Sequence, residues 1–164
     1  MKKFVITLVA LIALAGVGVW QFAGADKMAP DITFVTLTGQ KITPADLRGK
    51  VVLVDFWATS CLTCIKQMPS MIKIYNKLAP KGYEAIFVAM QYDPPNYVLN
   101  YTQTRKLPFP VVIDAQGQIA KAYGNISLTP TAFLIDKQGH IIKRYLGNHN
   151  EVTFMNTIKK ALAD

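Results

Sequence analysis

The sequence predicts an α/β fold in which a central mixed β-sheet is flanked by helices. Three short apolar runs, at residues 51–57, 83–90 and 111–113, have the length and composition of buried strands. Two segments, at residues 65–78 and 151–163, carry apolar side chains three and four residues apart and predict amphipathic helices. Because strands and helices alternate along the chain, we expect one sheet with helices packed on it.

The first elements of the domain are expected to be short. Residues 32–37 alternate well enough for a strand, and residues 38–40 form its predicted turn. Thr43 is placed to cap a single helical turn in which Pro44 takes the first position and which Gly49 closes. The chain then enters the central strand.

The later elements end with a hairpin and a helix. Asp93 is placed to cap a helix that has a proline in its first turn. Residues 118–123 have room for two helical turns. Residues 133–135 and 141–145, joined by a turn at 136–139, predict a β-hairpin at one edge of the sheet. This hairpin is the reason why the sheet is expected to be mixed.

The only two cysteines, Cys61 and Cys64, form a Cys-x-x-Cys pair where the strand at 51–57 gives way to a helix. The first N–H groups of a helix are unpaired and carry partial positive charge, which favours a thiolate over a thiol. Free cysteine titrates at about 8.5, and Cys-x-x-Cys thiols at helix starts range from about 3.5 to 7.5. Cys61 is therefore expected to form a mixed disulfide with a substrate, which the more buried Cys64 resolves.

Asp55 is a carboxylate inside the apolar run at 51–57. An isolated buried carboxylate costs several kcal/mol unless it is neutralised, paired or functionally required. Burial should raise its pKa. The alternative is an aspartate at the strand end that reaches solvent or a lysine such as Lys66.

Four pieces of sequence carry a resemblance to a known family. In chain order they are VDFWAT at 54–59, the cysteine pair, Met-Pro at 68–69 and TPTAFLID at 129–136. With them the chain resembles the thioredoxin superfamily and, more narrowly, the TlpA/ResA-like membrane-tethered thiol-disulfide oxidoreductases outside the bacterial cytoplasm. The resemblance extends over residues 30–163.

The resemblance implies roles for individual residues. Asp55 takes the position of the buried acid behind the second cysteine, so it is expected to accept the proton of Cys64. Thr129 and Pro130 take the position of a loop whose cis proline faces the cysteine pair, and the Thr129 backbone is expected to bind an extended substrate strand. A trans proline is the alternative, since only about 5 to 6% of X-Pro bonds in folded proteins are cis. Trp57 is assigned to the same substrate-binding site.

Two positions depart from the usual pattern of the family. Ser60 stands where the family usually has a second tryptophan, and Thr63 stands where it usually has a proline. Both positions tune the redox potential, so the direction of electron transfer stays open. Many relatives also place an acidic residue near the active site just after the strand at 83–90. Asp93 fills that role or acts only as a helix cap.

Residues 1–25 predict a membrane-targeting segment. Lys2 and Lys3 precede a stretch at residues 4–25 that has no charged side chain. As a helix it would span about 33 Å, enough for a hydrocarbon core of about 30 Å, whereas the apolar region of a cleavable signal is usually about 7 to 15 residues. The length favours an uncleaved inner-membrane anchor, and the two lysines place the following domain in the periplasm.

A small-x-small pattern that ends at Ala25 leaves a cleaved signal as the alternative, which would release a soluble periplasmic protein. A tether at residues 26–31 then leads into the thioredoxin-like domain at 32–164. Conditions outside the cytoplasm are oxidising, so a cysteine pair can exchange there between dithiol and disulfide.

The composition argues against several other functions. The formal charge is +8, but the basic residues are scattered, so nucleic acid is not an expected partner. Zinc would need two further ligands, and His140 and His149 are nine residues apart instead of three to five. No metal site is therefore expected, and no cofactor besides the Cys61–Cys64 disulfide. A thioredoxin-like copper metallochaperone remains a non-enzymatic alternative, although such relatives generally have a longer cysteine spacing and a dedicated histidine ligand.

Within the redox class, the resemblance favours a reductant. Members of the TlpA/ResA-like branch mostly keep cytochrome c apoprotein thiols or copper-site cysteines reduced, with electrons from a membrane thiol transporter. The expected partners are therefore protein disulfides and a membrane thiol-electron donor, and the domain is expected to be a monomer. A thiol oxidase of the same fold is the alternative.

Overall fold

The computed structural model describes residues 27–164 as an α/β domain around a five-stranded sheet with strand order β5-β4-β3-β6-β7. The strands are β3 (Val51–Trp57), β4 (Tyr83–Ala89), β5 (Val111–Ile113), β6 (Thr131–Ile135) and β7 (Ile141–Leu146). β3 pairs in parallel with β4 and antiparallel with β6, and β6 and β7 form the edge hairpin. The predicted thioredoxin-like mixed sheet is therefore confirmed.

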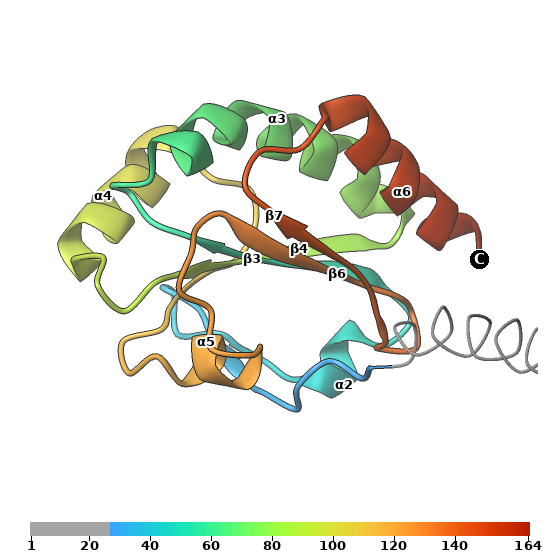
Figure 1. The fold of residues 1–164 in the computed structure, drawn as a ribbon, viewed down its shortest axis with the longest axis horizontal. Helices are drawn as coiled ribbons and strands as arrows, with labels where there is room; N and C mark the ends of the chain where they lie inside the picture. The colour runs from blue at the N-terminus through green and yellow to red at the C-terminus, as the bar shows by residue number, and fades with distance from the viewer. Residues whose placement is uncertain (1–26) are drawn as a thin grey trace, which may run out of the picture.

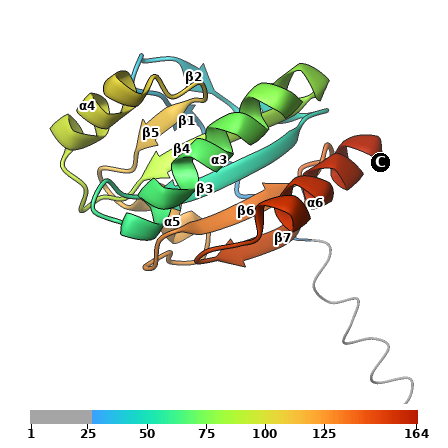
Figure 2. The same cartoon turned by 90° about the horizontal axis from the view of Figure 1, so that it is seen from above.

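Helices cover both faces of this sheet (Figure 1). One face carries α3 (Leu62–Leu78), α4 (Pro95–Arg105) and α6 (Glu151–Ala163), and the other carries α2 (Pro44–Leu47) and α5 (Gln118–Ala122). A short 3-10 helix, η1 (Ala79–Lys81), ends at Gly82 and leads into β4. Seen from above, α3 crosses the middle of the sheet and α6 lies over β6 and β7 (Figure 2).

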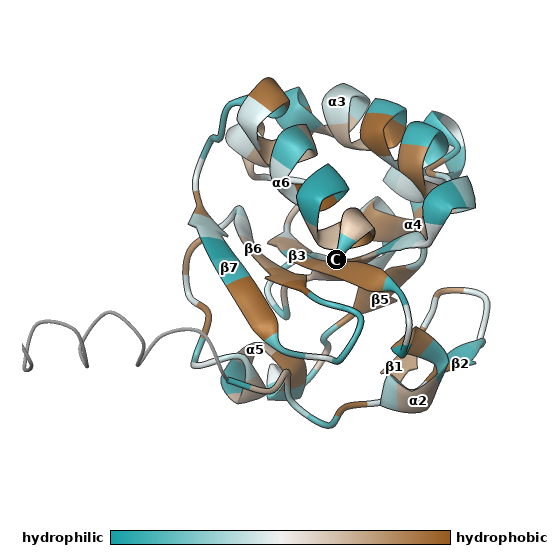
Figure 3. Cartoon of the chain, turned by 90° about the vertical axis from the view of Figure 1, so that its right-hand side faces the viewer, coloured by the Kyte–Doolittle hydropathy of each residue, from teal (hydrophilic) through white to brown (hydrophobic). Residues whose placement is uncertain are grey.

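The central strand β3 is buried along its whole length because both of its faces meet a helical layer. Successive side chains of a strand point to opposite faces. Leu53 and Trp57 join the apolar cluster on the α3 side, whereas Val54 and Phe56 join the cluster on the α5 side. In Figure 3, β3 and β6 are coloured as hydrophobic over most of their length, whereas the edge strand β7 has both hydrophilic and hydrophobic segments.

The elements before β3 differ in part from the prediction. The strand expected at 32–37 is only β1 (Phe34–Val35), and it pairs antiparallel with an unpredicted strand, β2 (Lys41–Ile42). A tight turn shortens β1, because the Thr36 N–H donates to the Gln40 carbonyl and the Gly39 N–H donates to the Thr36 carbonyl. The turn at 38–40 was predicted correctly, but the strand was predicted too long.

The two predicted helix caps have different outcomes. Thr43 caps α2, as expected, and it also forms a capping box with Asp46 that was not predicted. Asp93 does not cap α4, so that prediction was wrong. The cap position belongs to Pro94, and Pro95 is the first helical residue. Two consecutive prolines shift the helix start by one residue, and Pro95 offers no N–H group for a cap to bind.

The predicted anchor at residues 4–25 lies outside the described residues. Among the helices within residues 27–164, none is both long and apolar enough to cross a membrane.

Candidate active site

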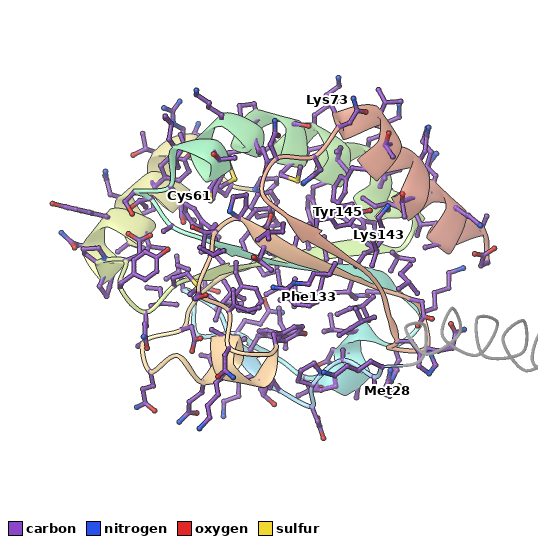
Figure 4. The ribbon with its side chains drawn as sticks, viewed as in Figure 1. Met28, Cys61, Lys73, Phe133, Lys143 and Tyr145 are labelled. Carbon is purple, nitrogen blue, oxygen red and sulfur yellow. A yellow bond between two sulfur atoms is a disulfide. The ribbon has the colours of Figure 1, made fainter. Side chains whose placement is uncertain are left out.

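Cys61 and Cys64 form a disulfide at the junction between β3 and α3, with their Cα atoms 5.3 Å apart. Cys61 is the N-cap of α3, and its Sγ accepts a hydrogen bond from the Cys64 N–H at 3.2 Å. Cys61 is partly exposed, whereas Cys64 is only 4% exposed. Figure 4 shows Cys61 at the start of the helix. The pair therefore has one sulfur within reach of solvent and one below it.

A short turn positions Cys61. After Trp57 the chain leaves the sheet, and the Cys61 N–H donates to the Ala58 carbonyl at 3.1 Å. The Cys61 carbonyl then accepts the first helical hydrogen bond, from Ile65 at 3.0 Å. The first turn of α3 contains no acidic side chain. Its free N–H groups therefore favour negative charge at the cap, which is where the Cys61 thiolate forms in the reduced state.

Asp55 is buried in the middle of β3, with 3% of its surface exposed. Its Oδ1 has no hydrogen-bond partner within residues 27–164, and burial raises its pKa to about 8. Leu53 and Trp57, two residues to either side, belong to the same apolar cluster as Cys64. Because side chains alternate along a strand, Asp55 faces the α3 layer that holds the pair.

The raised pKa that we predicted for Asp55 is confirmed, and the alternative of a solvent-exposed strand end is wrong. No ion pair of Asp55 with a lysine occurs in the described part of the chain. Its role as a proton acceptor stays a prediction.

Other polar atoms on the α3 side of the sheet also have no partner within residues 27–164. Two of them are Trp57 Nε1 and the hydroxyl of Tyr145. Ala132 pairs with Asp55 on one side and with Tyr145 on the other, so only a small side chain separates the two polar groups across the sheet. Tyr145 points into the layer of α3 and α6 in Figure 4, whereas Phe133 lies on the opposite face.

The Thr129–Pro130 peptide bond is cis, as predicted from the resemblance. Thr131, the next residue, pairs with Phe56, which places the proline beside the end of β3 where the turn to Cys61 begins. The Pro130 carbonyl accepts a hydrogen bond from the Gly147 N–H at 2.9 Å. Thr129 has no backbone partner among the described residues, so its backbone groups are free to bind an added strand.

Trp57 is 1% exposed and packs against Tyr101, with ring centroids 5.5 Å apart. The predicted contact between Trp57 and a substrate does not fit this burial. The indole lies in the same apolar cluster as Cys64.

The structure places Asp93 beside the active site, which is one of the two roles that the sequence left open for this residue. Its carboxylate is 2% exposed and accepts two hydrogen bonds from Thr59, one from the backbone N–H at 2.6 Å and one from the hydroxyl at 2.5 Å. Thr59 is two residues before Cys61, so Asp93 does lie next to the active site. The only indication of this position came from the resemblance, because many relatives have an acidic residue after this strand.

Four exposed apolar or aromatic side chains lie on the segments that form the site. Leu62 follows Cys61, Leu128 precedes Thr129, Leu146 pairs with Thr131, and the Tyr92 hydroxyl lies 3.3 Å from Thr129 Oγ1; these four are 66%, 62%, 58% and 54% exposed, respectively. Their positions around a redox-active disulfide suit a site that receives a protein segment. Sequence reasoning did not single them out, because they are isolated apolar residues in loops (Tyr92 and Leu128) or at the ends of elements (Leu62 and Leu146), where no periodic pattern marks them.

No group of three or more His, Cys, Asp or Glu side chains that could hold a metal occurs within residues 27–164. His140 instead lies beside Asp136, with Nδ1 and Oδ2 3.4 Å apart.

Comparison with known proteins agrees with this geometry. The Redoxin family model matches residues 24–162. The chain belongs to the Redoxin family. It is 38% identical to the thiol-disulfide oxidoreductase ResA of Bacillus thuringiensis subsp. konkukian, over 95% of this chain and 93% of the relative.

Two solved structures have the same fold. A putative thioredoxin from Neisseria meningitidis is 35% identical, with a TM-score of 0.79 over 85% of this chain and 93% of that one. A putative thiol:disulfide interchange protein DsbE from Chlorobium tepidum is 28% identical, with a TM-score of 0.76 over 84% of this chain and 97% of that one. With its Cys61–Cys64 disulfide, this Redoxin-family chain is a ResA-like thiol-disulfide oxidoreductase.

Proposed function

We propose that this oxidoreductase is a reductant that acts in the periplasm on disulfides of exported proteins. The observation that carries the direction is Asp55, a carboxyl group that is buried, has no hydrogen-bond donor and has a pKa raised to about 8. The low-polarity environment that raises the pKa of Asp55 also disfavours a negative charge on Cys64, which lies in the same apolar cluster as the neighbours of Asp55 on β3. The reduced pair is then high in free energy relative to the disulfide, so it gives up its electrons readily.

The reaction begins when the Cys61 thiolate attacks one sulfur of a substrate disulfide. A Cys61–substrate disulfide forms, the substrate S–S bond breaks, and the released substrate thiolate takes a proton from solvent. Cys64 then transfers its proton to the Asp55 carboxylate and attacks Cys61 Sγ. The second substrate thiolate leaves, and the Cys61–Cys64 disulfide of the structure remains. Two electrons have passed from the dithiol to the substrate.

Asp55 can accept a proton only in its ionised form. With a pKa of about 8, about a tenth of this group is ionised at pH 7. The resolving step should therefore accelerate as the pH rises from 7 to 8. A new round needs two electrons from another dithiol, and a membrane thiol-electron donor is the proposed source.

The substrates are protein segments that present a disulfide to Cys61. The exposed apolar side chains of Leu62, Leu128, Leu146 and Tyr92 support a protein substrate, as do the free backbone groups of Thr129. Cytochrome c apoproteins and copper-site cysteines are the proposed classes. The domain works as a monomer that residues 4–25 attach to the inner membrane, or as a soluble periplasmic protein if cleavage occurs after Ala25.

The decisive measurement is the equilibrium of the Cys61–Cys64 pair with glutathione or thioredoxin. Thioredoxin has a reduction potential of about −270 mV, whereas a strongly oxidising member of the fold lies at about −120 mV. We expect a value near the reducing end. A potential above about −150 mV would make the protein a thiol oxidase instead.

Two cysteine variants test the order of the steps. Cys64→Ala should accumulate mixed disulfides through Cys61, and Cys61→Ala should abolish reduction of a model disulfide such as that of insulin. An unchanged rate in Cys61→Ala would remove Cys61 from the mechanism. Membrane fractionation with N-terminal sequencing tests the anchor separately, because a soluble product that starts at Asp26 leaves the chemistry untouched.

A further inference from the structure

The loop between β4 and α4 contacts both halves of the active site through two adjacent residues. Asp93 accepts the two hydrogen bonds of Thr59, which lies in the turn before Cys61. Tyr92 places its hydroxyl 3.3 Å from the hydroxyl of Thr129, the residue before the cis proline. The cysteine turn and the proline loop come from distant parts of the chain, and this loop is attached to each of them.

The two contacts differ in burial. Asp93 is 2% exposed, and both of its oxygens accept a hydrogen bond, which is the arrangement of an ionised carboxylate. Hydrogen bonds to a charged group are stronger than those between neutral groups. Tyr92 is 54% exposed, and its contact with Thr129 is open to solvent. We therefore expect a strong attachment at Thr59 and a weak one at Thr129.

We propose that Asp93 and Tyr92 are positioning residues of the redox site, which hold the turn before Cys61 and the loop before Pro130 in the relative placement that exchange requires. Neither residue needs to touch the reacting sulfurs. Asp93 acts through Thr59, and Tyr92 acts through Thr129.

The charge of Asp93 gives this proposal a property that a purely structural contact lacks. The Asp93 carboxylate is hydrogen-bonded to Thr59, two positions before Cys61. Cys61 is the N-cap of α3, and its thiolate must form at this N-terminus. A fixed negative charge there opposes the Cys61 thiolate, and so it counteracts part of the stabilisation by the helix N-terminus. Removing the charge should make the reduced form of the pair more stable.

The proposal rests on thiol-disulfide exchange but not on its direction. The direction depends on the absolute potential of the parent protein, whereas the positioning role depends on the difference between variants and parent. The two can therefore fail separately. The measurements are the pKa of the Cys61 thiol from its ultraviolet thiolate absorbance, the equilibrium constant with glutathione, the steady-state reduction of insulin and the unfolding midpoint in urea.

Asp93→Asn keeps an oxygen for the Thr59 N–H and removes the charge. We expect a lower Cys61 pKa and an equilibrium constant for reduction by glutathione that rises by about threefold to tenfold. A tenfold change corresponds to about 30 mV in potential for a two-electron couple.

Thr59→Val removes only the hydroxyl contact and should slow insulin reduction by about threefold to tenfold, whereas Thr59→Ser keeps that hydroxyl and should restore the parent rate. Tyr92→Phe should raise KM by about twofold and leave kcat and the potential unchanged.

Asp114→Asn is the matched control. Asp114 is also a buried aspartate, 4% exposed, and it also accepts two hydrogen bonds, from the N–H groups of Ile119 and Ala120. Its variant should lower the unfolding midpoint without changing the Cys61 pKa. If Asp93→Asn lowers the midpoint but leaves the Cys61 pKa and the equilibrium constant at the parent values, Asp93 is structural and the proposal is wrong. An unchanged KM in Tyr92→Phe would show that Tyr92 is not a positioning residue.

Discussion

The two faces of the sheet each bury an aspartate, but only one of these groups is satisfied. On the α5 face, Asp114 accepts hydrogen bonds from the backbone N–H groups of Ile119 and Ala120 at 3.1 and 2.7 Å, and so fixes the start of α5. On the α3 face, Asp55 has an oxygen without a partner in the described part of the chain, and burial raises its pKa to about 8. The same residue type therefore stabilises one face and destabilises the other.

The side chains around the two aspartates also differ between the two faces of the sheet. On the α5 face, the rings of Phe56, Tyr123 and Phe133 pack against one another, with centroids 5.1 to 6.2 Å apart. On the α3 face, the unpartnered groups of Asp55 and Tyr145 lie in the same layer as Cys64. A buried polar group without a partner costs folding free energy. That cost is concentrated on the face where the exchange chemistry takes place, which is expected where function, not stability, fixed the residue.

Asp55→Asn should have the largest effect on this difference. The Asp55 pKa of about 8 in the folded protein lies above its ordinary value of 3.8, so the folded state holds a proton that the unfolded state has lost between these pH values. At about 1.4 kcal/mol per pH unit, removing the ionisable group should raise the free energy of unfolding at pH 7 by at most about 4 kcal/mol. Urea denaturation of both proteins measures this gain.

The sign of the pH dependence is a second readout of the same variant. Because its folded-state pKa is raised, Asp55 imposes no penalty below pH 3.8, and the penalty grows until the pH passes about 8. The advantage of Asp55→Asn should therefore increase over this interval and then level off. The variant should also reduce substrate more slowly at neutral pH, since Cys64 has lost its proton acceptor. A variant less stable than the parent at pH 7 would show that Asp55 has a partner.

Asp114→Asn should shift stability in the opposite direction. The amide offers one acceptor oxygen to the two N–H groups that the carboxylate now binds. We expect a loss of about 1 to 3 kcal/mol in the free energy of unfolding, with the rate of insulin reduction unchanged. Equal losses in Asp114→Asn and Asp55→Asn would mean that the two faces do not differ in the way described above.

Long elements were predictable from the sequence because their pattern repeats over many residues. The helix predicted at 151–163 is α6, and the strand predicted at 51–57 is β3. The position of the cysteine pair between a strand and a helix could also be predicted, and so could the burial of Asp55. Both follow from the residues next to them in the sequence. The strand at 32–37 was less reliable, because a turn at Thr36 limits β1 to two residues.

The contacts of Asp93 and Tyr92 could not be predicted in this way. Asp93 binds Thr59 across 34 positions, and Tyr92 approaches Thr129 across 37. Capping preferences consider only neighbouring residues, and an aspartate before two prolines fits a helix cap. Only the pairing of β4 with β3 brings the ends of these strands, and with them the two loops, side by side. The residue types alone do not indicate that these two loops lie close together.

Tyr145→Phe tests the smallest part of the difference between the faces. The Tyr145 hydroxyl is buried and has no partner in residues 27–164, so its removal should leave stability unchanged or raise it by about 0.5 to 1 kcal/mol. Tyr75→Phe is the control, because the Tyr75 hydroxyl donates to Glu84 Oε1 at 3.0 Å and its loss should cost about 0.5 to 1.5 kcal/mol. Urea denaturation at pH 7 distinguishes the two signs.

A cost in Tyr145→Phe equal to that in Tyr75→Phe would indicate that the Tyr145 hydroxyl is hydrogen-bonded in solution. Since only Ala132 separates Tyr145 from Asp55 across the sheet, a bound water would then be the simplest partner for both, and the proton of Cys64 would have a route beyond Asp55.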